Sequence, residues 1–353
     1  MKGLALGRLQ SLELINQPVT WLITQLIIRA WSGWAVRLRG SNSHCTLAPP
    51  SVESHRMSAP PASHQDHWDS IAYVNGDYLP LREAKVSVLD RGFLFADAVY
   101  EVVAVLDGKL LDFDAHFDRL ERSRQALDLP LPLTRQEFAA LHLELRQRNA
   151  LTEGLIYSQL SRGAALRSFD FPPSDTAPSL VAFTQHKVLR QDPLAQRGLR
   201  VISLPDQRWQ RRDIKSVGLL AQSIAKQSAK LAGVDDAWMV EAGYVTEGTS
   251  NSAFVITPAG KLLVRPNSSA ILPGITRAAL LKLVSETDLS IETRRFTVEE
   301  AQQAAEAFVT SATSLVMPVV EIDQVAIGEG TAGPYAKRLR DLYIESAVAK
   351  GLA

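Results

Sequence analysis

The sequence has very little cysteine and no excess of charge of either sign, and each of these absences excludes a class of protein. Cys45 is the single cysteine among 353 residues. An internal disulfide framework and a cysteine-rich zinc site are therefore both excluded, which fits a reducing cytoplasm. Lys plus Arg equals Asp plus Glu at 38 each, so no strong field attracts nucleic acid or an anionic membrane. We expect a cytoplasmic protein with small-molecule partners, no metal, and no nucleic-acid or membrane partner.

The motifs of two common enzyme classes are also missing. The sequence contains neither a G-x-x-x-x-G-K-[ST] phosphate loop nor an H-E-x-x-H zinc motif, and it shows no internal repeat. What the chain does have is enough length for two domains. Its hydrophobic fraction of 46% suffices for two cores.

Residues 1–67 differ in composition from the rest of the chain. They hold three of the six tryptophans and carry six basic residues against three acidic ones. The apolar run from Val19 to Val36 contains Gln25 and Arg29, which makes it a poor transmembrane segment. Two interpretations remain, a transit peptide or sequence upstream of a natural start at Met57, and we favour the second. We predict a leader at 1–67, disordered or not part of the native chain, and we expect residues 1–66 to be dispensable for fold and activity.

Regular elements begin at Ile71. Asn75-Gly76 predicts a hairpin turn, and Thr134 with Glu137 predicts the capping box of a helix that ends near Asn149. The other elements expected in this first unit are strands at 99–105, 110–113, 155–160 and 179–183 and a helix at 116–127. Strands with two helices make an α+β layout, so residues 68–186 are predicted to form a small N-terminal α+β domain.

A polar segment with a proline predicts a linker at 187–198, and a larger domain at 199–353 follows. Its predicted helices lie at 217–231, 276–287, 298–307 and 334–349. Its predicted strands lie at 236–240, 245–247, 253–256, 261–264, 308–311 and 316–322. Because hairpins connect most of these strands, a Rossmann fold is not expected.

Two charged side chains stand in segments suited to chemistry. Lys215 precedes an apolar helix, where the neighbouring guanidiniums of Arg208, Arg211 and Arg212 would favour a neutral, nucleophilic amine. Glu247 ends a strand and opens a tight loop of small polar residues. Each also has an ordinary explanation, a solvated lysine at a helix start and a solvated glutamate in a turn.

Three further segments complete the set. Residues 272–277 and 310–314 offer hydroxyl and backbone N–H groups suited to a phosphate, although each could be an N-cap or a turn. Residues 90–101 run from Asp-Arg-Gly into a β-branched strand. Singly these signals are weak, and their combination and order make them informative.

In that order the segments resemble the class IV aminotransferases, the fold-type IV pyridoxal-phosphate enzymes, and most closely the D-amino acid group of that family. The resemblance runs from about Tyr73 to about Leu342. It implies two mixed α/β domains with pyridoxal 5'-phosphate between them, and a homodimer. It also implies transamination between D-amino acids and 2-oxo acids, such as D-alanine with 2-oxoglutarate.

The resemblance also implies a role for nine residues. Lys215 matches the catalytic lysine, which forms the Schiff base with the cofactor and moves the proton between substrate and cofactor. Glu247 matches the carboxylate that faces the pyridine nitrogen. The positions that match phosphate-binding residues are Arg119, Ile275, Thr276, Ser311 and Ala312. Tyr100 and Arg167 match residues that bind the substrate carboxylate, with Arg167 reaching in from the partner subunit.

Three positions depart from the family pattern. Phe169 stands where a histidine follows the carboxylate-binding arginine, and Ser252 replaces an asparagine. The usual Phe-Gly-Asp-Gly is Phe-Ala-Asp-Ala at 95–98. The first departure changes the expected substrate profile. Three alternatives are weighed against D-amino acid transamination: a branched-chain L-aminotransferase, an aminodeoxychorismate lyase, and a protein that binds the cofactor without catalysis.

Overall fold

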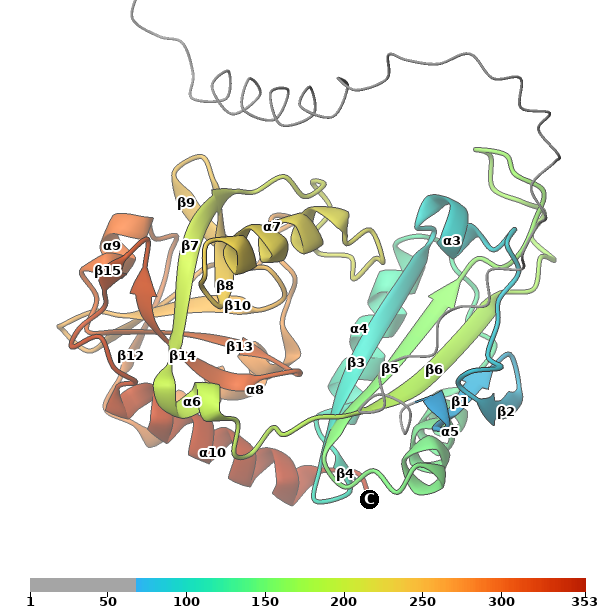
Figure 1. Ribbon diagram of the computed structural model, residues 1–353, viewed down its shortest axis with the longest axis horizontal. Helices are drawn as coiled ribbons and strands as arrows, with labels where there is room; N and C mark the ends of the chain where they lie inside the picture. Colours follow the sequence, from blue (N-terminus) through green and yellow to red (C-terminus); the bar gives the residue numbers. More distant parts are fainter. Residues whose placement is uncertain (1–67) are drawn as a thin grey trace, which may run out of the picture. The chain divides into compact units, whose positions relative to one another are not determined.

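Two β-sheets organise the protein in the computed structural model, which describes residues 68–353 (Figure 1). The predictions made for the leader fall outside the described residues. The first sheet is built from residues 71–186 and the second from residues 199–326. Each sheet has its own helices, and the α+β class expected from the sequence is confirmed.

The first sheet has the strand order β2-β1-β6-β5-β3-β4, and all its pairs are antiparallel. Its strands are β1 (Ile71–Val74), β2 (Asp77–Pro80), β3 (Ala98–Leu106), β4 (Lys109–Leu110), β5 (Gly154–Ser161) and β6 (Ser179–His186). Its helices are α3 (Arg91–Phe95), α4 (Phe113–Gln125) and α5 (Arg135–Arg148). Apolar side chains of α4 and α5 form a core against one face of this sheet.

Local sequence explains two of these elements. Asn75 and Gly76 both have positive φ, 51° and 112°, which the tight turn of the β1–β2 hairpin requires and which these two residue types tolerate. Thr134 and Glu137 form the predicted capping box at the start of α5. The predicted strand 110–113 is wrong beyond Leu110, because Asp112 enters the left-handed region and α4 begins at Phe113.

The second sheet has the order β12-β11-β10-β13-β14-β7-β8-β9, with β15 on β14. Its strands are β7 (Leu199–Pro205), β8 (Asp236–Glu241), β9 (Tyr244–Gly248), β10 (Ser252–Ile256), β11 (Lys261–Val264), β12 (Ser290–Thr293), β13 (Glu306–Ser311), β14 (Leu315–Ile322) and β15 (Val325–Ala326). The helices are α6 (Pro193–Arg197), α7 (Leu220–Leu231), α8 (Ile275–Leu281), the 3-10 helix η2 (Val284–Glu286), α9 (Val298–Gln302) and α10 (Pro334–Lys350). Strands β14, β7 and β8 run parallel, and β12 is parallel to β11.

Several predicted helices are shorter in the structure. The helix expected at 298–307 ends at Gln302 because the chain enters β13 at Glu306. The helix expected at 276–287 divides into α8 and η2, and the one expected from residue 217 begins at Leu220. The predicted linker contains the short helix α6, capped by Asp192. Strands β7 and β12 and the two-residue strand β15 were not predicted.

One buried apolar cluster joins the two sheets. It combines Leu106 and Leu155 of the first sheet with Phe254 and Phe308 of the second, whose rings stack 4.8 Å apart, and with Leu339 of α10. We therefore propose two domains, 68–186 and 199–353. Each is built on its own sheet, and the two share a core. Cleavage by a protease within 187–198 would test it, because two units that share a core should stay associated after the cut.

Candidate active site

A pocket of about 220 Å³ lies where the two sheets meet, with lining residues from β3, α4 and the large second sheet. Eight of the nine residues singled out in the sequence line it. They are Tyr100, Arg119, Lys215, Glu247, Ile275, Thr276, Ser311 and Ala312. The ninth, Arg167, lies elsewhere. Segments more than a hundred residues apart along the chain therefore converge on one cavity.

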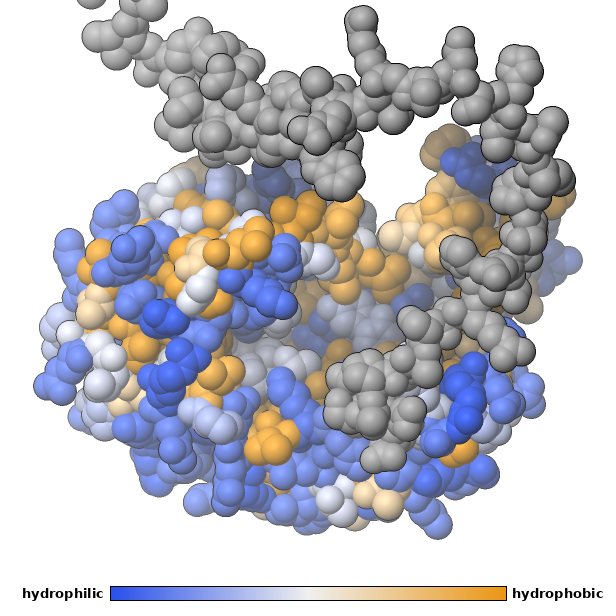
Figure 2. All heavy atoms as spheres, in the orientation of Figure 1, coloured by the Kyte–Doolittle hydropathy of each residue, from blue (hydrophilic) through white to orange (hydrophobic). Residues whose placement is uncertain are grey.

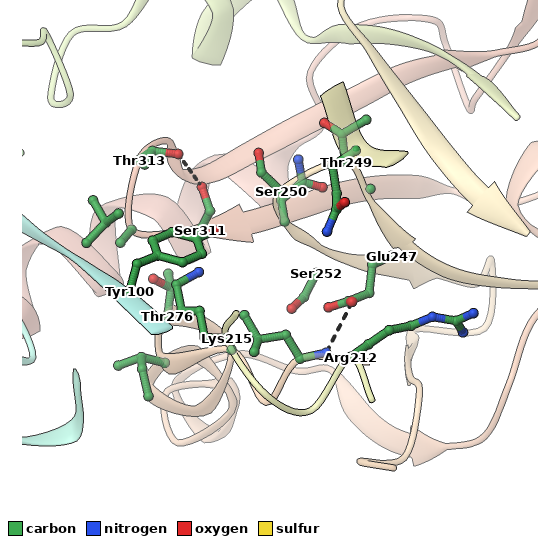
Figure 3. Close-up of a pocket in the computed structure, with 18 of the residues that line it drawn as sticks. Tyr100, Arg212, Lys215, Glu247, Thr249, Ser250, Ser252, Thr276, Ser311 and Thr313 are labelled. Atoms are coloured by element: carbon green, nitrogen blue, oxygen red, sulfur yellow. Dashed lines mark hydrogen bonds between the residues drawn. The ribbon is translucent and has the colours of Figure 1, made fainter. Parts of the chain in front are cut away.

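Lys215 is held against β3 by its backbone. The Tyr100 N–H donates to the carbonyl of Lys215 at 3.0 Å, and the Val217 N–H donates to the carbonyl of Ala98 at 3.1 Å. This strand-like pairing places the Lys215 ammonium 4.1 Å from the centre of the Tyr100 ring (Figure 3). A cation at that distance is attracted to the face of the ring. The amine is thus presented to the pocket beside an aromatic wall.

Glu247 lies at the end of β9 and is only 5% exposed. Its Oε2 accepts hydrogen bonds from Arg208 Nη1 at 2.6 Å and from the Leu272 N–H at 3.1 Å. Burial raises the pKa of the Glu247 carboxyl, and the Arg208 guanidinium opposes that rise. Both donors converge on the same oxygen. Within residues 68–353 this arrangement leaves Oε1 without a hydrogen-bond partner, in a residue that lines the pocket.

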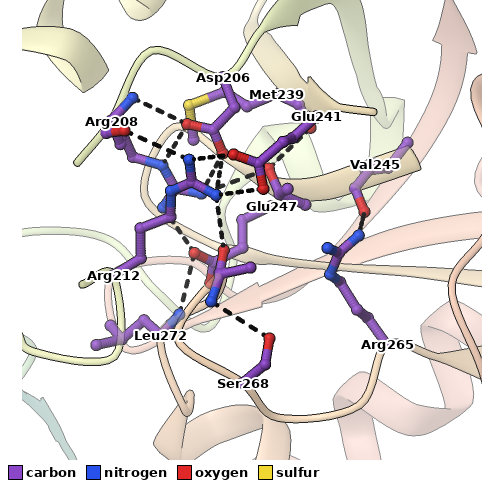
Figure 4. Close-up of polar contacts among 12 residues, drawn as sticks. Asp206, Arg208, Arg212, Met239, Glu241, Val245, Glu247, Arg265, Ser268 and Leu272 are labelled. Atoms are coloured by element: carbon purple, nitrogen blue, oxygen red, sulfur yellow. Dashed lines mark hydrogen bonds and ion pairs between the residues drawn. The ribbon is translucent and has the colours of Figure 1, made fainter. Parts of the chain in front are cut away.

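A network of alternating charges lies behind Glu247 (Figure 4). Arg208 also binds Asp206 through Nε at 3.0 Å and Nη2 at 2.8 Å. Arg212 binds Glu241 with both terminal nitrogens, at 3.0 and 2.8 Å, and lies 3.6 Å from Asp206. Each guanidinium is therefore matched by carboxylates.

The idea that nearby arginines favour a neutral Lys215 amine receives no support from these contacts. Arg208 and Arg212 face carboxylates, and Figure 3 shows Arg212 directed away from Lys215. Arg211 pairs with Asp213 at 3.0 Å on the surface. These cations serve the carboxylate network instead.

Arg119 belongs to a second buried network on the α4 side of β3. Its Nε and Nη2 bind the two oxygens of Glu101 at 2.7 and 2.8 Å, and Nη1 donates to the Pro273 carbonyl at 3.3 Å. His116 Nδ1 lies 2.8 Å from Glu101 Oε2. Burial alone would raise the pKa of the Glu101 carboxyl, but Arg119 and His116 hold it well below its usual range. The Glu101 carboxylate thus fixes the orientation of the Arg119 guanidinium.

The pocket carries more polar groups than the protein itself satisfies. Asn251 Oδ1, Gln222 Oε1 and Thr310 Oγ1 are buried, line the pocket and have no hydrogen-bond partner within residues 68–353. Ser311 Oγ bonds only to its neighbours Thr313 and Ser314, at 3.0 and 2.8 Å, among the contacts in that part of the chain. Leaving buried polar atoms unpaired is costly. The pocket is therefore suited to a ligand with several polar groups.

Arg167 and Phe169 lie on an exposed loop between β5 and β6. The Arg167 guanidinium stacks 5.3 Å from the Phe95 ring and 5.6 Å from the Phe169 ring. Phe169 is 82% exposed. The structure therefore does not bring Arg167 to the pocket of its own chain.

Sequence reasoning missed four lining or supporting residues: Glu101, His116, Asp206 and Gln222. A signal existed for one of them, because His116 and Arg119 are three residues apart on a helix and so share a face. Within residues 68–353 no group of three His, Cys, Asp or Glu side chains is placed to bind a metal. No helix among the same residues is long and apolar enough to cross a bilayer.

Comparison with known proteins matches this chain to an enzyme family. The family described as amino-transferase class IV matches residues 98–322. The D-alanine aminotransferase of Staphylococcus haemolyticus is 35% identical over 277 residues, which cover 78% of this chain and 98% of that protein. The D-alanine aminotransferase of Bacillus licheniformis is 35% identical over 266 residues, covering 75% and 93%.

A solved structure shares the fold. The T.th. branched-chain amino acid aminotransferase, determined with pyridoxamine 5'-phosphate, superposes with a TM-score of 0.73 at 26% identity. The match covers 80% of this chain and 95% of the other. The chain belongs to the class IV aminotransferases.

Proposed function

We propose that this protein transfers amino groups between D-amino acids and 2-oxo acids, such as D-alanine and 2-oxoglutarate, with pyridoxal 5'-phosphate bound in the pocket. The observation that carries the proposal is the 35% identity to a D-alanine aminotransferase over almost the whole of that enzyme. The gathering of Lys215, Glu247 and Arg119 around one cavity agrees with it.

The residues present fit the cofactor. A phosphate needs hydrogen-bond donors and positive charge. Arg119 and the hydroxyls of Thr276, Thr310 and Ser311 supply them. A protonated pyridine nitrogen needs a carboxylate acceptor, which Glu247 Oε1 provides. An aldehyde needs an amine within the same cavity, and Lys215 presents one.

Pyridoxal phosphate, when bound, supplies an aldehyde that exchanges amino groups and a ring that withdraws electrons from the substrate Cα. Lys215 would then act as a general base and a general acid: it would remove the proton from the substrate Cα and deliver it to the cofactor. Glu247 holds the ring nitrogen in its protonated form. Tyr100 forms the wall beside the Lys215 amine and contributes to binding the substrate carboxylate.

We also propose a homodimer in which Arg167 of one protomer binds the substrate carboxylate in the site of its partner. Figure 2 shows apolar side chains exposed around α3 and over α7. Val88, Phe93, Leu166 and Phe169 are 73–85% exposed. Apolar side chains gathered in this way are typical of a surface that binds another protein. The single cysteine supports placing this dimer in the cytoplasm.

One assay separates this proposal from its alternatives. The purified protein, supplied with pyridoxal phosphate, is incubated with 2-oxoglutarate and a panel of D- and L-amino acids, and formation of the new 2-oxo acid is followed. We expect turnover of D-alanine, with Lys215→Ala as the inactive control. Preference for branched-chain L-amino acids, the substrate class in the name of the T.th. enzyme, would overturn D-specificity. Absence of any turnover in cofactor-loaded protein would exclude transamination and leave the aminodeoxychorismate lyase and binding without catalysis.

A further inference from the structure

We propose that Asp206 is a positioning residue that balances the charge of Arg208, so that the potential around Glu247 stays negative and the cofactor ring nitrogen facing Glu247 stays protonated. Asp206 does not line the pocket. The inference rests on the proposed function, because it concerns the group that Glu247 would face.

The geometry gives Arg208 two carboxylate partners. Asp206 binds one edge of the guanidinium with both oxygens, at 3.0 and 2.8 Å, and the remaining Nη1 reaches Glu247 at 2.6 Å. All three side chains are buried, with exposed fractions of 0%, 7% and 6% for Asp206, Arg208 and Glu247. This two-point contact fixes the plane of the guanidinium. It therefore also determines which oxygen of Glu247 accepts the hydrogen bond from Arg208.

Thr246 locks the same arrangement from β9. Its Oγ1 lies 2.6 Å from Asp206 Oδ2 and 3.0 Å from the Met239 carbonyl. Thr246 directly precedes Glu247 in the strand. A displacement of Asp206 would therefore also displace Glu247. The network therefore sets the position of Glu247 as well as the electrostatic potential around it.

Asp206 also balances an excess of positive charge. Arg208 and Arg212 lie within the network, and the buried Arg265 and Arg277 lie close enough to act electrostatically on Glu247. Burial raises the pKa of the Glu247 carboxyl; Arg208 lowers it, and the negative charge of Asp206 raises it. Charges act more strongly on one another in a buried site than in water.

Removing the charge of Asp206 would leave Arg208 with Glu247 as its one carboxylate partner. The electrostatic potential at Glu247 Oε1 would then become less negative, and a pyridinium facing this oxygen would be less stable. Glu241 lies at the far end of the network and is 44% exposed, so solvent screens its charge. It provides a matched control.

The experiment compares Asp206→Asn, Asp206→Glu and Glu241→Gln with the wild type, each loaded with cofactor carrying 15N in the ring. We expect the ring-nitrogen chemical shift of Asp206→Asn to move toward that of neutral pyridine. We expect kcat to fall about tenfold, as for a pKa change of one unit, with KM within about twofold. Asp206→Glu and Glu241→Gln should retain the wild-type shift.

A double variant separates charge from structure. In Asp206→Asn combined with Arg208→Gln, the uncompensated guanidinium is gone, so the ring nitrogen should return toward its protonated state. This arm also serves if Asp206→Asn alone does not fold, because the double variant contains no Arg208 guanidinium left without Asp206. A protonated nitrogen in Asp206→Asn, or a double variant less protonated than the single one, would overturn the proposal. A wild type that fails to bind cofactor or to transaminate would instead refute the proposed function.

Discussion

Lys215 presents its amine to the pocket beside the Tyr100 ring, and its backbone is bonded to β3. We expect borohydride reduction of the cofactor-loaded protein, followed by peptide mapping, to place the pyridoxyl label on Lys215. Lys215→Ala should lose at least about a thousandfold in kcat, because the general acid and base is removed. Lys230→Ala, on the exposed side of α7, is the control. A label on any other lysine would disprove the assignment.

Phe169 gives a second prediction for a single residue. On the exposed loop it packs against Arg167 and against Phe95 of α3, so it would accompany Arg167 into the partner's site. A histidine there would add a hydrogen bond to the substrate carboxylate. Such a bond to a charged group contributes about 1.5–3 kcal/mol, or roughly tenfold or more in affinity. We expect Phe169→His to lower KM for D-alanine while selectivity for D-amino acids stays.

The control for this substitution lies in the same loop. Phe171 stacks 3.7 Å from the Arg162 guanidinium, so Phe171→His should leave KM unchanged. Steady-state kinetics on D-alanine and D-glutamate measure both variants. An unchanged KM for both substrates in Phe169→His would show that Phe169 does not reach a carboxylate site.

Helix α5 contains a pH-sensitive element of stability. His142 is fully buried between Phe113 and Phe138, with Nδ1 bonded to the Phe138 carbonyl at 2.8 Å. Burial lowers the pKa of His142 from 6.5 to about 4. The unfolded chain therefore binds a proton between pH 6.5 and 4 while the folded protein does not. The contribution of neutral His142 to the free energy of unfolding is therefore complete above pH 6.5. Below that pH it falls by about 1.4 kcal/mol per pH unit.

We expect His142→Phe to remove that part of the pH dependence. Denaturant unfolding at pH 7, 5.5 and 4.5 should show a free-energy difference between wild type and variant that shifts in favour of the variant as the pH falls. The comparison of the two proteins cancels the contributions of other titrating groups. A difference that is constant across this range would mean that His142 is protonated equally in the folded and unfolded states.

Shared active sites are the prediction for the whole molecule. Lys215→Ala and Arg167→Ala should each be inactive. In a hybrid dimer one site carries both changes and the other carries neither. Random mixing makes half of the dimers hybrids with one intact site each, so the mixture should recover about a quarter of the wild-type activity. Mixed dimers demonstrated by a tag on each chain, but without activity, would contradict the sharing of sites.

The sequence by itself determined the features that depend on neighbouring residues. The Asn75-Gly76 turn and the Thr134–Glu137 capping box follow from the residue types at adjacent positions. The order of short motifs likewise predicted the family, which the match over residues 98–322 confirms. These signals are local, so a linear reading recovers them.

Only the tertiary structure decided which charges meet. The register of β7 and β9 around β8 brings Asp206, Arg208 and Glu247 together. The packing of α4 on β3 pairs Arg119 with Glu101. Arg208 and Arg212, which lie near Lys215 in the sequence, form ion pairs with carboxylates of other strands. Helix α9 stops where β13 must begin to pair with β10 and β14. Contacts between distant residues depend on strand register and packing, which no local pattern encodes.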